Sequence, residues 1–598
     1  MTIFDCETYP NCFLLNALTL ETGERRSYEI SYWRNDFVKL RTDLPGFGEM
    51  VGFNSLGFDY PLVHWMMKHG DPSAREIYDQ AMRIINGEDK TTIWRSDRYA
   101  VQIDLFKIHH FDNMARATSL KVLEFNMRMD NISDLPFKVG TILTREQVEV
   151  LREYCWHDVH ATALFLEQSR EQIAFRRDLA KRHPKYDWLN FSDVKIGKIV
   201  FQMELEKQHV PCYSSEGPIQ TIRSFINLGD CMPAGIALER PEFRAIYDRI
   251  ASTTIAETKG AFKDLSATVE GVEYVFGTGG LHASVSNKSY IADDEYMIYD
   301  IDVTSLYPSI AITRGYYPKH LGEKFVEVYR QLLDQRMSHP KGSAENAMLK
   351  LALNGVYGAS GDKYSIFFDT KFTMRITIGG QMMIAKLVEY LLSIKGMEII
   401  QVNTDGITMR IPRAIKPTVD FMCAMWEQLT HLHLESVEYS KMFIADVNSY
   451  LAVKTGGSIK RKGRYEYDTG WHQNGSSKVI AKVAEQHLVY GADIESTVCN
   501  WSDKMDFMLR AKIPRSSRLE YNDSRLLENT QRYYMSKEGG TLTKIMPPLP
   551  KAPDKERRIA IQKGYTVCPC NNIKDATMSV DYDWYIEEIK TLCEVNHA

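Results

Sequence analysis

The chain has 598 residues, of which 44% are hydrophobic and 25% charged, so it can bury a large core and should divide into several domains. Its net charge of −5 argues against a uniformly basic nucleic-acid coat, although clustered carboxylates can hide a local basic groove. No apolar run approaches the roughly 20 residues needed to cross a bilayer, so no membrane partner is expected. The ten cysteines are scattered, as in a reducing cytosol, and the close pair Cys568 and Cys570 lacks the matching pair that a zinc site needs.

The N-terminal part of the chain predicts an α/β domain over residues 1–185. Strands are expected first, and the spacing of apolar residues then favours helices. A capping box at Thr144-x-x-Gln147 predicts the start of a helix that runs to about Gln172. The other expected elements are strands at Met1–Phe4, Phe13–Leu20, Arg25–Ile30 and Met50–Phe53 and a helix at Asp59–His69.

Three acidic motifs follow one another in this region. Asp5-x-Glu7, expected at the end of the first strand, turns both carboxylates to one face of that strand. The second motif is Asn54-x-x-x-Phe58-Asp59, at a junction between strand and helix. In the third, Tyr154-x-x-x-Asp158, the phenol and the carboxylate stack on one helical face. A surface acid pair is the alternative for the first motif alone, but the ordered set of three indicates a metal site.

Together these motifs resemble the proofreading 3′→5′ exonucleases, whose domain is ribonuclease-H-like. The resemblance implies that Asp5, Glu7, Asp59 and Asp158 hold two metal ions and that Tyr154 positions the attacking water. It further implies single-strand DNA contacts from Asn54 and from the segment Ser119-Leu120-Lys121-Val122-Leu123, with Ser119 and Leu120 as the contacting residues. For the last two, the start of a helix on an amphipathic segment is an equally open alternative.

Residues 184–280 carry little signal beyond Gly277–Gly280, which predicts a tight turn or linker. A second group of motifs then lies on an alternating pattern of elements. We expect strands at Tyr296–Val303 and Glu398–Asn403, and helices at Glu323–Met337 and Ala344–Gly355.

The most specific stretch is Asp302-Val-Thr-Ser-Leu-Tyr-Pro-Ser-Ile310, in which a carboxylate at a strand end precedes backbone amides that could cradle a triphosphate. It resembles the first palm motif of family B DNA polymerases; a strand entering a Pro-containing turn is the alternative. The resemblance implies that Asp302, with Val303 beside it, binds the metals. It places Ser305 and Leu306 at the nucleotide and Tyr307 under the deoxyribose, where the ring would exclude a 2′-hydroxyl.

A helical motif of the same family reads here Lys350-x-x-x-Asn354-Gly-x-Tyr357-Gly. The three named side chains fall on one helical face and could meet one nucleotide together. Arg336, upstream, resembles the arginine of the partner finger helix that also reaches the triphosphate. A solvated helix face is the alternative for Arg336.

The last palm motif of the family is Asp-Thr-Asp, whereas this chain has Asn403-Thr404-Asp405. The resemblance makes Asp405 the metal ligand opposite Asp302. Asn403 keeps a hydrogen-bonding oxygen but loses a charge, which puts the metal affinity or the preferred ion in question.

A short basic segment after this motif contains Lys460, Lys462 and Arg464. It resembles the primer-gripping segment of the family, and a solvated loop is the alternative. Contacts of this kind to phosphates would be salt-sensitive and independent of sequence.

The resemblance as a whole implies an α/β multidomain enzyme, with an exonuclease domain followed by a palm-fingers-thumb right hand. We expect a DNA-dependent DNA polymerase that extends a primer 3′-OH with dNTPs by two-metal phosphoryl transfer and proofreads, using two Mg²⁺ per active site with Mn²⁺ as a substitute. The expected domains are the exonuclease (1–185), linker and start of palm (186–270), palm (271–318 and 381–470), fingers (319–380) and thumb (471–598).

Spacing and length suggest a compact phage-type enzyme. Asp5 lies too near the start for the N-terminal domain of larger family B enzymes, and the gaps after Asp302 and Gly358 look too short for protein-priming insertions. Expected partners are primer-template DNA and a processivity factor, helicase or single-strand-binding protein, in the cytoplasm of a phage-infected bacterium. The alternatives are a protein-primed or primer-independent polymerase, and a nucleic-acid-binding protein or nuclease with a decayed polymerase site.

Overall fold

A computed structural model describes residues 1–550, 555–574 and 577–597. It forms two compact units. Unit 1 comprises residues 1–193, 467–479 and 499–585, and unit 2 comprises residues 194–466, 480–498 and 586–598. Neither unit is therefore a single stretch of sequence.

The N-terminal part of unit 1 is a five-stranded sheet with strand order β3-β2-β1-β4-β5. The β1, β2 and β3 strands are antiparallel, whereas β4 and β5 run parallel to β1. The strands are β1 Thr2–Tyr9, β2 Cys12–Thr19, β3 Glu24–Ser31, β4 Glu49–Gly52 and β5 Val101–Asp104. The helices are α1 Phe37–Asp43, α2 Asp59–His69, α3 Ala74–Ile85, α4 Leu105–Ile108, α5 Leu120–Asn126, α6 Arg145–Gln168 and α7 Arg170–Arg182.

Alternation along β1 decides which face of the sheet carries its acids. Phe4 and Cys6 pack in a core with residues of α1, α2 and α3, whereas Ile3 packs in a second core with residues of α6. Because side chains alternate along a strand, Asp5 and Glu7 share the face of Ile3 and lie toward α6. The sequence predicted these two acids at the end of the strand, and this prediction is wrong. Both acids lie inside β1, because pairing with β2 continues to Tyr9.

Most expected elements of this region are confirmed. The α2 helix has the predicted bounds, and Thr144 and Gln147 form the predicted capping box, with each backbone N–H bound by the other side chain. The α6 helix ends at Gln168, four residues before the predicted end, and Ser169 separates it from α7.

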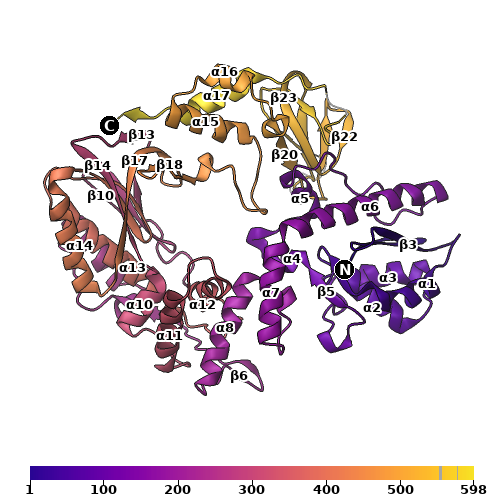
Figure 1. Cartoon of the computed structure of the whole chain (residues 1–598), viewed down its shortest axis with the longest axis horizontal. Coiled ribbons are helices and arrows are strands. Elements are labelled where there is room, and N and C mark those ends of the chain that lie inside the picture. The colour runs from indigo at the N-terminus through magenta and orange to yellow at the C-terminus, as the bar shows by residue number, and fades with distance from the viewer. Residues whose placement is uncertain (551–554, 575–576, 598) are drawn as a thin grey trace. The chain divides into compact units, whose positions relative to one another are not determined.

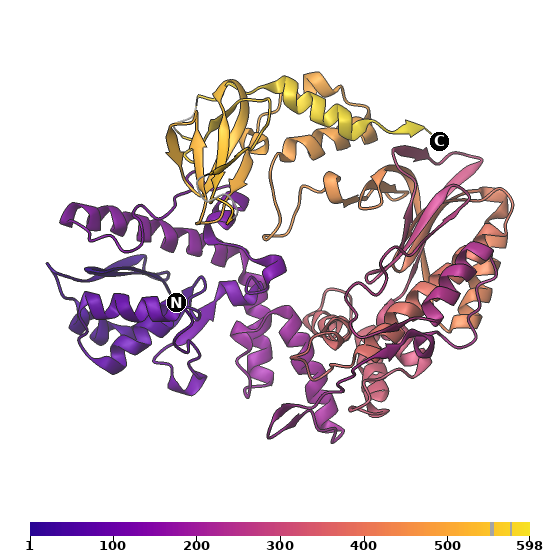
Figure 2. The same ribbon diagram turned by 180° about the vertical axis from the view of Figure 1, so that it is seen from behind.

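Residues 499–585 add a β module to unit 1, made of two small sheets with orders β20-β23-β26 and β22-β21-β24-β25. Figures 1 and 2 both show this module beside α5, which contacts β23. The side chain of Arg532, 1% exposed, donates to the carbonyls of Met129 (2.6 Å) and Asp130 (2.7 Å) and so joins the module to the N-terminal domain. The strands are β20 Leu509–Lys512, β21 Arg518–Tyr521, β22 Arg525–Leu527, β23 Thr530–Gly540, β24 Leu542–Met546, β25 Arg557–Ala560 and β26 Val567–Pro569.

The segment predicted as a thumb, 471–598, thus contributes to both units. Its helices are α15 Lys478–Tyr490, α16 Ile494–Cys499 and α17 Tyr582–Cys593, and its last strand is β27 Asn596–His597. Its assignment as a thumb stays a prediction.

Unit 2 is built on a large sheet with strand order β10-β11-β12-β15-β16-β14-β17-β13-β27, to which β18 and β19 are added at β17. Figure 1 shows α13 and α14 along one side of this sheet. The strands of the sheet are β10 Ser266–Val269, β11 Val272–Gly277, β12 Gly280–Ser284, β13 Lys288–Ile291, β14 Tyr296–Val303, β15 Glu398–Asn403, β16 Gly406–Pro412, β17 Leu434–Asp446, β18 Ser449–Lys454 and β19 Ile459–Lys462.

The helices of unit 2 are α8 Asp193–Lys207, α9 Pro241–Ala251, α10 Leu306–Arg314, α11 Lys324–Ser338, α12 Ala344–Ser360, α13 Thr370–Leu392 and α14 Lys416–Thr430. The short strands pair into two two-stranded sheets, β6 Tyr213–Ser214 with β7 Gly217–Pro218, and β8 Ile226–Asn227 with β9 Thr254–Ile255. The β14 and β15 strands have the predicted bounds, and α12 runs five residues beyond its predicted end. Within the described residues, no helix combines the length and apolar character that a membrane span requires.

Candidate active sites

Unit 1 brings the predicted acids of all three motifs together. One carboxylate oxygen from each of Asp5, Glu7 and Asp158 lies within 4.8 Å of the others. The β1 strand supplies the first two and α6 the third. Asp59, the first residue of α2, accepts a hydrogen bond from the backbone N–H of Cys6 (3.3 Å), which fixes it next to the same strand.

The electrostatics of this cluster fit a bound cation. Burial raises the pKa of Asp5 and of Glu7 well above the ordinary range, and the neighbouring carboxylates add to the shift. Burial likewise raises the pKa of Asp59 to about 8. Crowded, buried carboxylates repel one another unless a proton or a cation lies between them. The residues present therefore suit divalent metal ions.

Lys121 is a member of this acidic site, a role that the sequence analysis did not assign to it. Its Nζ donates to Asp158 and to Glu124 (3.2 Å) and lies 4.5 Å from the ring centroid of Tyr154. Burial alone would lower the pKa of Lys121, but the two carboxylates outweigh it and raise the pKa. The available signal was a lysine on an apolar helical stretch, three residues before a glutamate on the same face.

The predicted DNA-contacting residues of unit 1 have local structural roles. Asn54 adopts a left-handed conformation (φ 61°), and its backbone N–H donates to Asp104 (2.9 Å). Ser119 directly precedes α5, and Leu120 is buried in the core beside Leu123. The helix-start interpretation of Ser119 and Leu120 therefore describes their local structure, and their contact with DNA stays a prediction.

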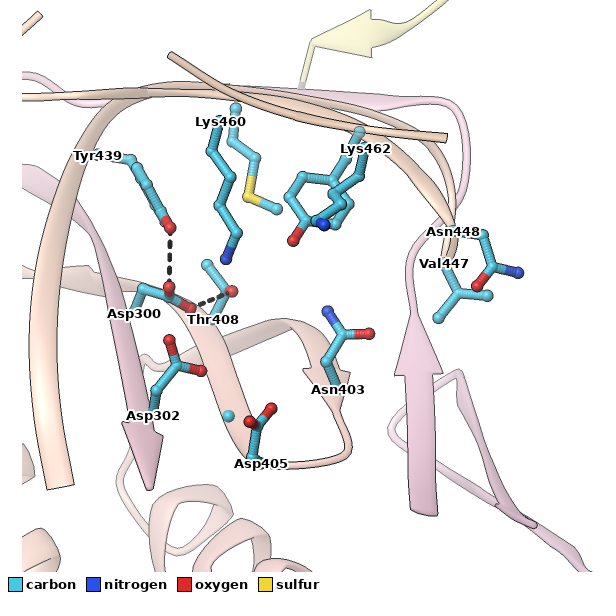
Figure 3. A pocket seen from close by; sticks show the side chains of 13 residues that line it. Asp300, Asp302, Asn403, Asp405, Thr408, Tyr439, Val447, Asn448, Lys460 and Lys462 are labelled. Atoms are coloured by element: carbon cyan, nitrogen blue, oxygen red, sulfur yellow. Dashed lines mark hydrogen bonds between the residues drawn. The ribbon is translucent and has the colours of Figure 1, made fainter. Parts of the chain in front are cut away.

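Unit 2 contains a cavity of about 380 Å³ at the predicted palm site (Figure 3). Asp302 lies near the end of β14, and Asp405 lies in the turn between β15 and β16. The backbone N–H of Val303 donates to the carbonyl of Asp405 (2.7 Å), which ties the two motifs together. The lining residues are Asp300, Asp302, Asn403, Asp405, Gly406, Thr408, Tyr439, Met442, Val447, Asn448, Tyr450, Lys460 and Lys462.

A glycine next to Asp302 makes room for its carboxylate. Gly406 pairs with Asp302 across β14 and β16, and a Cβ at Gly406 would lie 1.8 Å from Oδ1 of Asp302. Burial, and then the charge of Asp300, raise the pKa of Asp302 to about 6. A half-buried carboxylate with room around it and a raised pKa is suited to hold a cation.

The palm acids are less tightly grouped than those of unit 1. Among the described residues, two sets of three ligand atoms lie within 4.8 Å of one another, and both are in unit 1. One is the Asp5, Glu7 and Asp158 set, and the other joins Glu124, His157 and Asp158. Asn403, where the resembled motif has a carboxylate, lines the same cavity as Asp302 and donates from Nδ2 to Oε1 of Gln401 (2.9 Å).

Asp300 is a second site residue that the sequence analysis did not assign. It is 5% exposed, and its two oxygens accept hydrogen bonds from the hydroxyls of Thr408 (2.6 Å) and Tyr439 (2.8 Å). Asp300 lies two residues before Asp302 on β14, so both side chains are on one face of the sheet. This spacing of two was the signal in the sequence.

The basic segment forms β19 and a turn after it. Alternation sends Lys460 and Lys462 toward the cavity, whereas Arg461 on the other face pairs with Glu485 (2.7 Å from Nη2). Figure 3 shows the Lys460 ammonium directed toward the palm acids. Arg464 is exposed in the 3₁₀ turn that follows β19.

The predicted nucleotide-contacting residues gather on α10, α11 and α12. The ring of Tyr307 stacks on that of Tyr357, with centroids 4.0 Å apart. Arg336 donates from Nη1 to the hydroxyl of Ser305 (3.3 Å), which precedes α10 in a left-handed conformation. Lys350 and Asn354 are exposed on α12, while Leu306 is buried.

The glycine turn at 277–280 is more than a linker, because it contacts both predicted palm motifs. The carbonyl of Gly279 accepts from the hydroxyls of Tyr307 (3.3 Å) and Thr404 (3.2 Å), one from each palm motif. A Cβ at Gly280 would lie 2.7 Å from the hydroxyl oxygen of Thr404, so the close approach needs a glycine there. The Gly-Gly pair was the sequence signal, but only its turn was predicted.

Comparisons with known proteins assign no role to any of these residues. No protein-family model matches the chain, and no curated protein matches it. Among solved structures, the family B DNA polymerase from the hyperthermophilic archaeon Pyrobaculum calidifontis is similar, at 13% sequence identity and a TM-score of 0.41. The match covers 99% of this chain and 77% of the archaeal chain. At these values the similarity assigns no function, and the functional argument rests on the residues of the two sites.

Proposed function

We propose that the chain is a template-directed DNA polymerase that extends a primer 3′-OH with dNTPs and carries its own 3′→5′ exonuclease. One observation carries the proposal: Asp302 and Asp405 share a cavity with Lys460, and Tyr307, on the α10 helix that follows Asp302, stacks on Tyr357 of α12. Acids, a basic strand and an aromatic platform are the parts that phosphoryl transfer to a DNA end requires.

Each palm residue has a role in this proposal. Asp302 and Asp405 would hold two Mg²⁺ ions, or Mn²⁺ in their place. When bound, such ions lower the pKa of the attacking hydroxyl and stabilise the charge on the phosphate. Arg336 and the exposed Lys350 would neutralise and orient the triphosphate, with Asn354 on the same face of α12. Lys460, Lys462 and Arg464 would hold the primer backbone.

The unit 1 cluster supports the proofreading activity. Asp5, Glu7, Asp59 and Asp158 would hold two divalent ions around a phosphodiester, and Tyr154 would position the attacking water. Lys121 fixes Asp158 and lies against the ring of Tyr154, so it would set the orientation of both groups. Its buried ammonium also offsets part of the acidic charge when no cation is bound.

The test is a primer-extension gel with a labelled primer-template and Mg²⁺. With dNTPs the primer should lengthen to the end of the template, and without dNTPs it should shorten from its 3′ end. Omitting the primer discriminates the protein-primed or primer-independent alternative, which predicts synthesis on template alone. A chain that binds DNA but neither extends nor shortens the primer would contradict the proposal.

A further inference from the structure

The charges that line the palm cavity are nearly balanced. Three carboxylates, Asp300, Asp302 and Asp405, face two ammonium groups, Lys460 and Lys462. The formal sum is three negative against two positive charges, a net of one negative charge. Without Asp300 the lining would be neutral and would attract a cation far less.

Asp300 is also the most firmly held of the three acids. Both oxygens accept hydrogen bonds, from Thr408 and from Tyr439, and all three residues are at most 5% exposed. These bonds fix the carboxylate of Asp300 on β14, two residues from Asp302.

The position of Lys460 completes the arrangement. Figure 3 shows its ammonium extending from β19 toward Asp300 and Thr408. Among the described residues, no lysine or arginine nitrogen lies within 4.0 Å of the carboxylates of Asp300, Asp302 or Asp405. The negative charge of these acids is therefore not paired with a basic side chain and can attract a cation.

We propose that Asp300 helps Asp302 and Asp405 to bind a cation, because it supplies the negative charge that Asn403 does not. The expected effect on DNA synthesis rests on the proposed function, whereas the effect on cation binding is a property of the cavity alone. Asn403 lies on β15 and faces the same cavity as Asp300, with β16 between their strands. A carboxylate at position 403 should therefore replace the charge lost at position 300.

The experiment compares Asp300→Asn, Asn403→Asp and the double variant, each in an Asp5→Ala/Glu7→Ala chain so that unit 1 neither degrades DNA nor binds the ion tightly. Mn²⁺ binding is measured by electron paramagnetic resonance without DNA, and primer extension is measured across a Mg²⁺ series.

Residues that orient metal ligands contribute on the order of 10- to 100-fold to affinity. We expect Asp300→Asn to weaken Mn²⁺ binding about tenfold and to raise the Mg²⁺ requirement similarly. Adding Asn403→Asp should restore both to within about threefold of the parent.

Glu438→Gln is the matched control, because Glu438 lies on β17 next to Tyr439 and alternation turns it to the opposite face of the sheet. It should leave Mn²⁺ binding unchanged. Two results would overturn the proposal: unchanged Mn²⁺ binding in Asp300→Asn, or a loss that Asn403→Asp does not restore, which is what a purely structural role predicts. A parent that binds Mn²⁺ but extends no primer would count against the proposed function, and the Mn²⁺ series would still decide the role of Asp300.

Discussion

The rings of Tyr307 and Tyr357 stack with their centroids 4.0 Å apart and their planes inclined by 23°. Tyr307 is held at a second point by the carbonyl of Gly279, and Tyr357 by the hydroxyl of Thr377 (2.7 Å). A ring fixed on both sides is a rigid wall. Rigidity matters because a reacting group misplaced by about 1 Å can lose on the order of a hundredfold in rate.

Tyr307→Ala or Tyr307→Val should therefore relax sugar selection. We expect ribonucleotide incorporation to rise relative to deoxynucleotide incorporation by at least about tenfold, because the wall that would meet a 2′-hydroxyl is removed. Both efficiencies are measured on one primer-template. An unchanged ratio, with both activities reduced alike, would mean that Tyr307 only packs the site.

The two activities should be separable, because their acids lie in different units. Asp302→Ala or Asp405→Ala should abolish extension and leave 3′→5′ degradation intact. Asp5→Ala with Glu7→Ala should do the reverse. Each loss should reach about a hundredfold or more, since a ligand of the reacting centre is removed. Near-normal extension by the Asp405 variant would refute its assignment as a metal ligand.

Placing at position 403 the aspartate of the resembled motif is a separate test in an otherwise unaltered chain. Asn403→Asp should leave extension intact and shift only the Mg²⁺ or Mn²⁺ optimum, because it adds a charge to a cavity that already has a net negative lining. Extension titrated with each metal measures the shift. A loss as deep as that of Asp405→Ala would show that the amide of Asn403 is itself required.

Gly406→Ala should impair synthesis through a direct steric conflict. The added Cβ would lie 1.8 Å from Oδ1 of Asp302 and 2.9 Å from the carbonyl of Ile301, so the carboxylate must move. Extension should fall by at least about tenfold while degradation persists. Gly456→Ala is the control, because a Cβ there meets nothing within 4 Å. Equal effects of the two substitutions would contradict the crowding argument.

The stability of the metal-free protein should depend on pH through Asp59. Its folded pKa of about 8 exceeds the ordinary value of 3.8, so the folded state binds more protons than the unfolded state between those limits. The stabilising contribution of protonated Asp59 is therefore fully present below pH about 4 and is lost as pH rises toward 8. Asp59→Asn should raise Tm in EDTA at pH 8 and flatten the pH dependence, whereas Asp112→Asn, at an exposed position, should not. A steeper pH dependence in Asp59→Asn would contradict the assignment.

Local patterns predicted single elements well and their assembly less well. The capping box at Thr144 and the strand over Tyr296–Val303 are confirmed because their signals are short-range. The Asp5 motif was placed at the end of its strand, since the sequence does not show that pairing with β2 continues to Tyr9. The roles of Lys121 and Asp300 were missed because a buried ion pair and a buried hydroxyl-bound acid depend on residues far away in sequence, Asp158 and Tyr439.

The discontinuity of unit 1 has a consequence for how the chain is made. Arg532 donates to the carbonyls of Met129 and Asp130, and Arg128 pairs with Asp503 (2.5 Å), so the N-terminal domain is completed by residues synthesised some 400 positions later. At about 5 to 20 residues per second, a ribosome needs about 20 seconds or longer to supply them. During that interval the nascent domain exposes the surface that the β module will cover, which makes it a client for chaperones. A fragment cut after residue 193 would keep that surface exposed permanently, so a fragment meant to fold alone would need residues 499–585 joined to it.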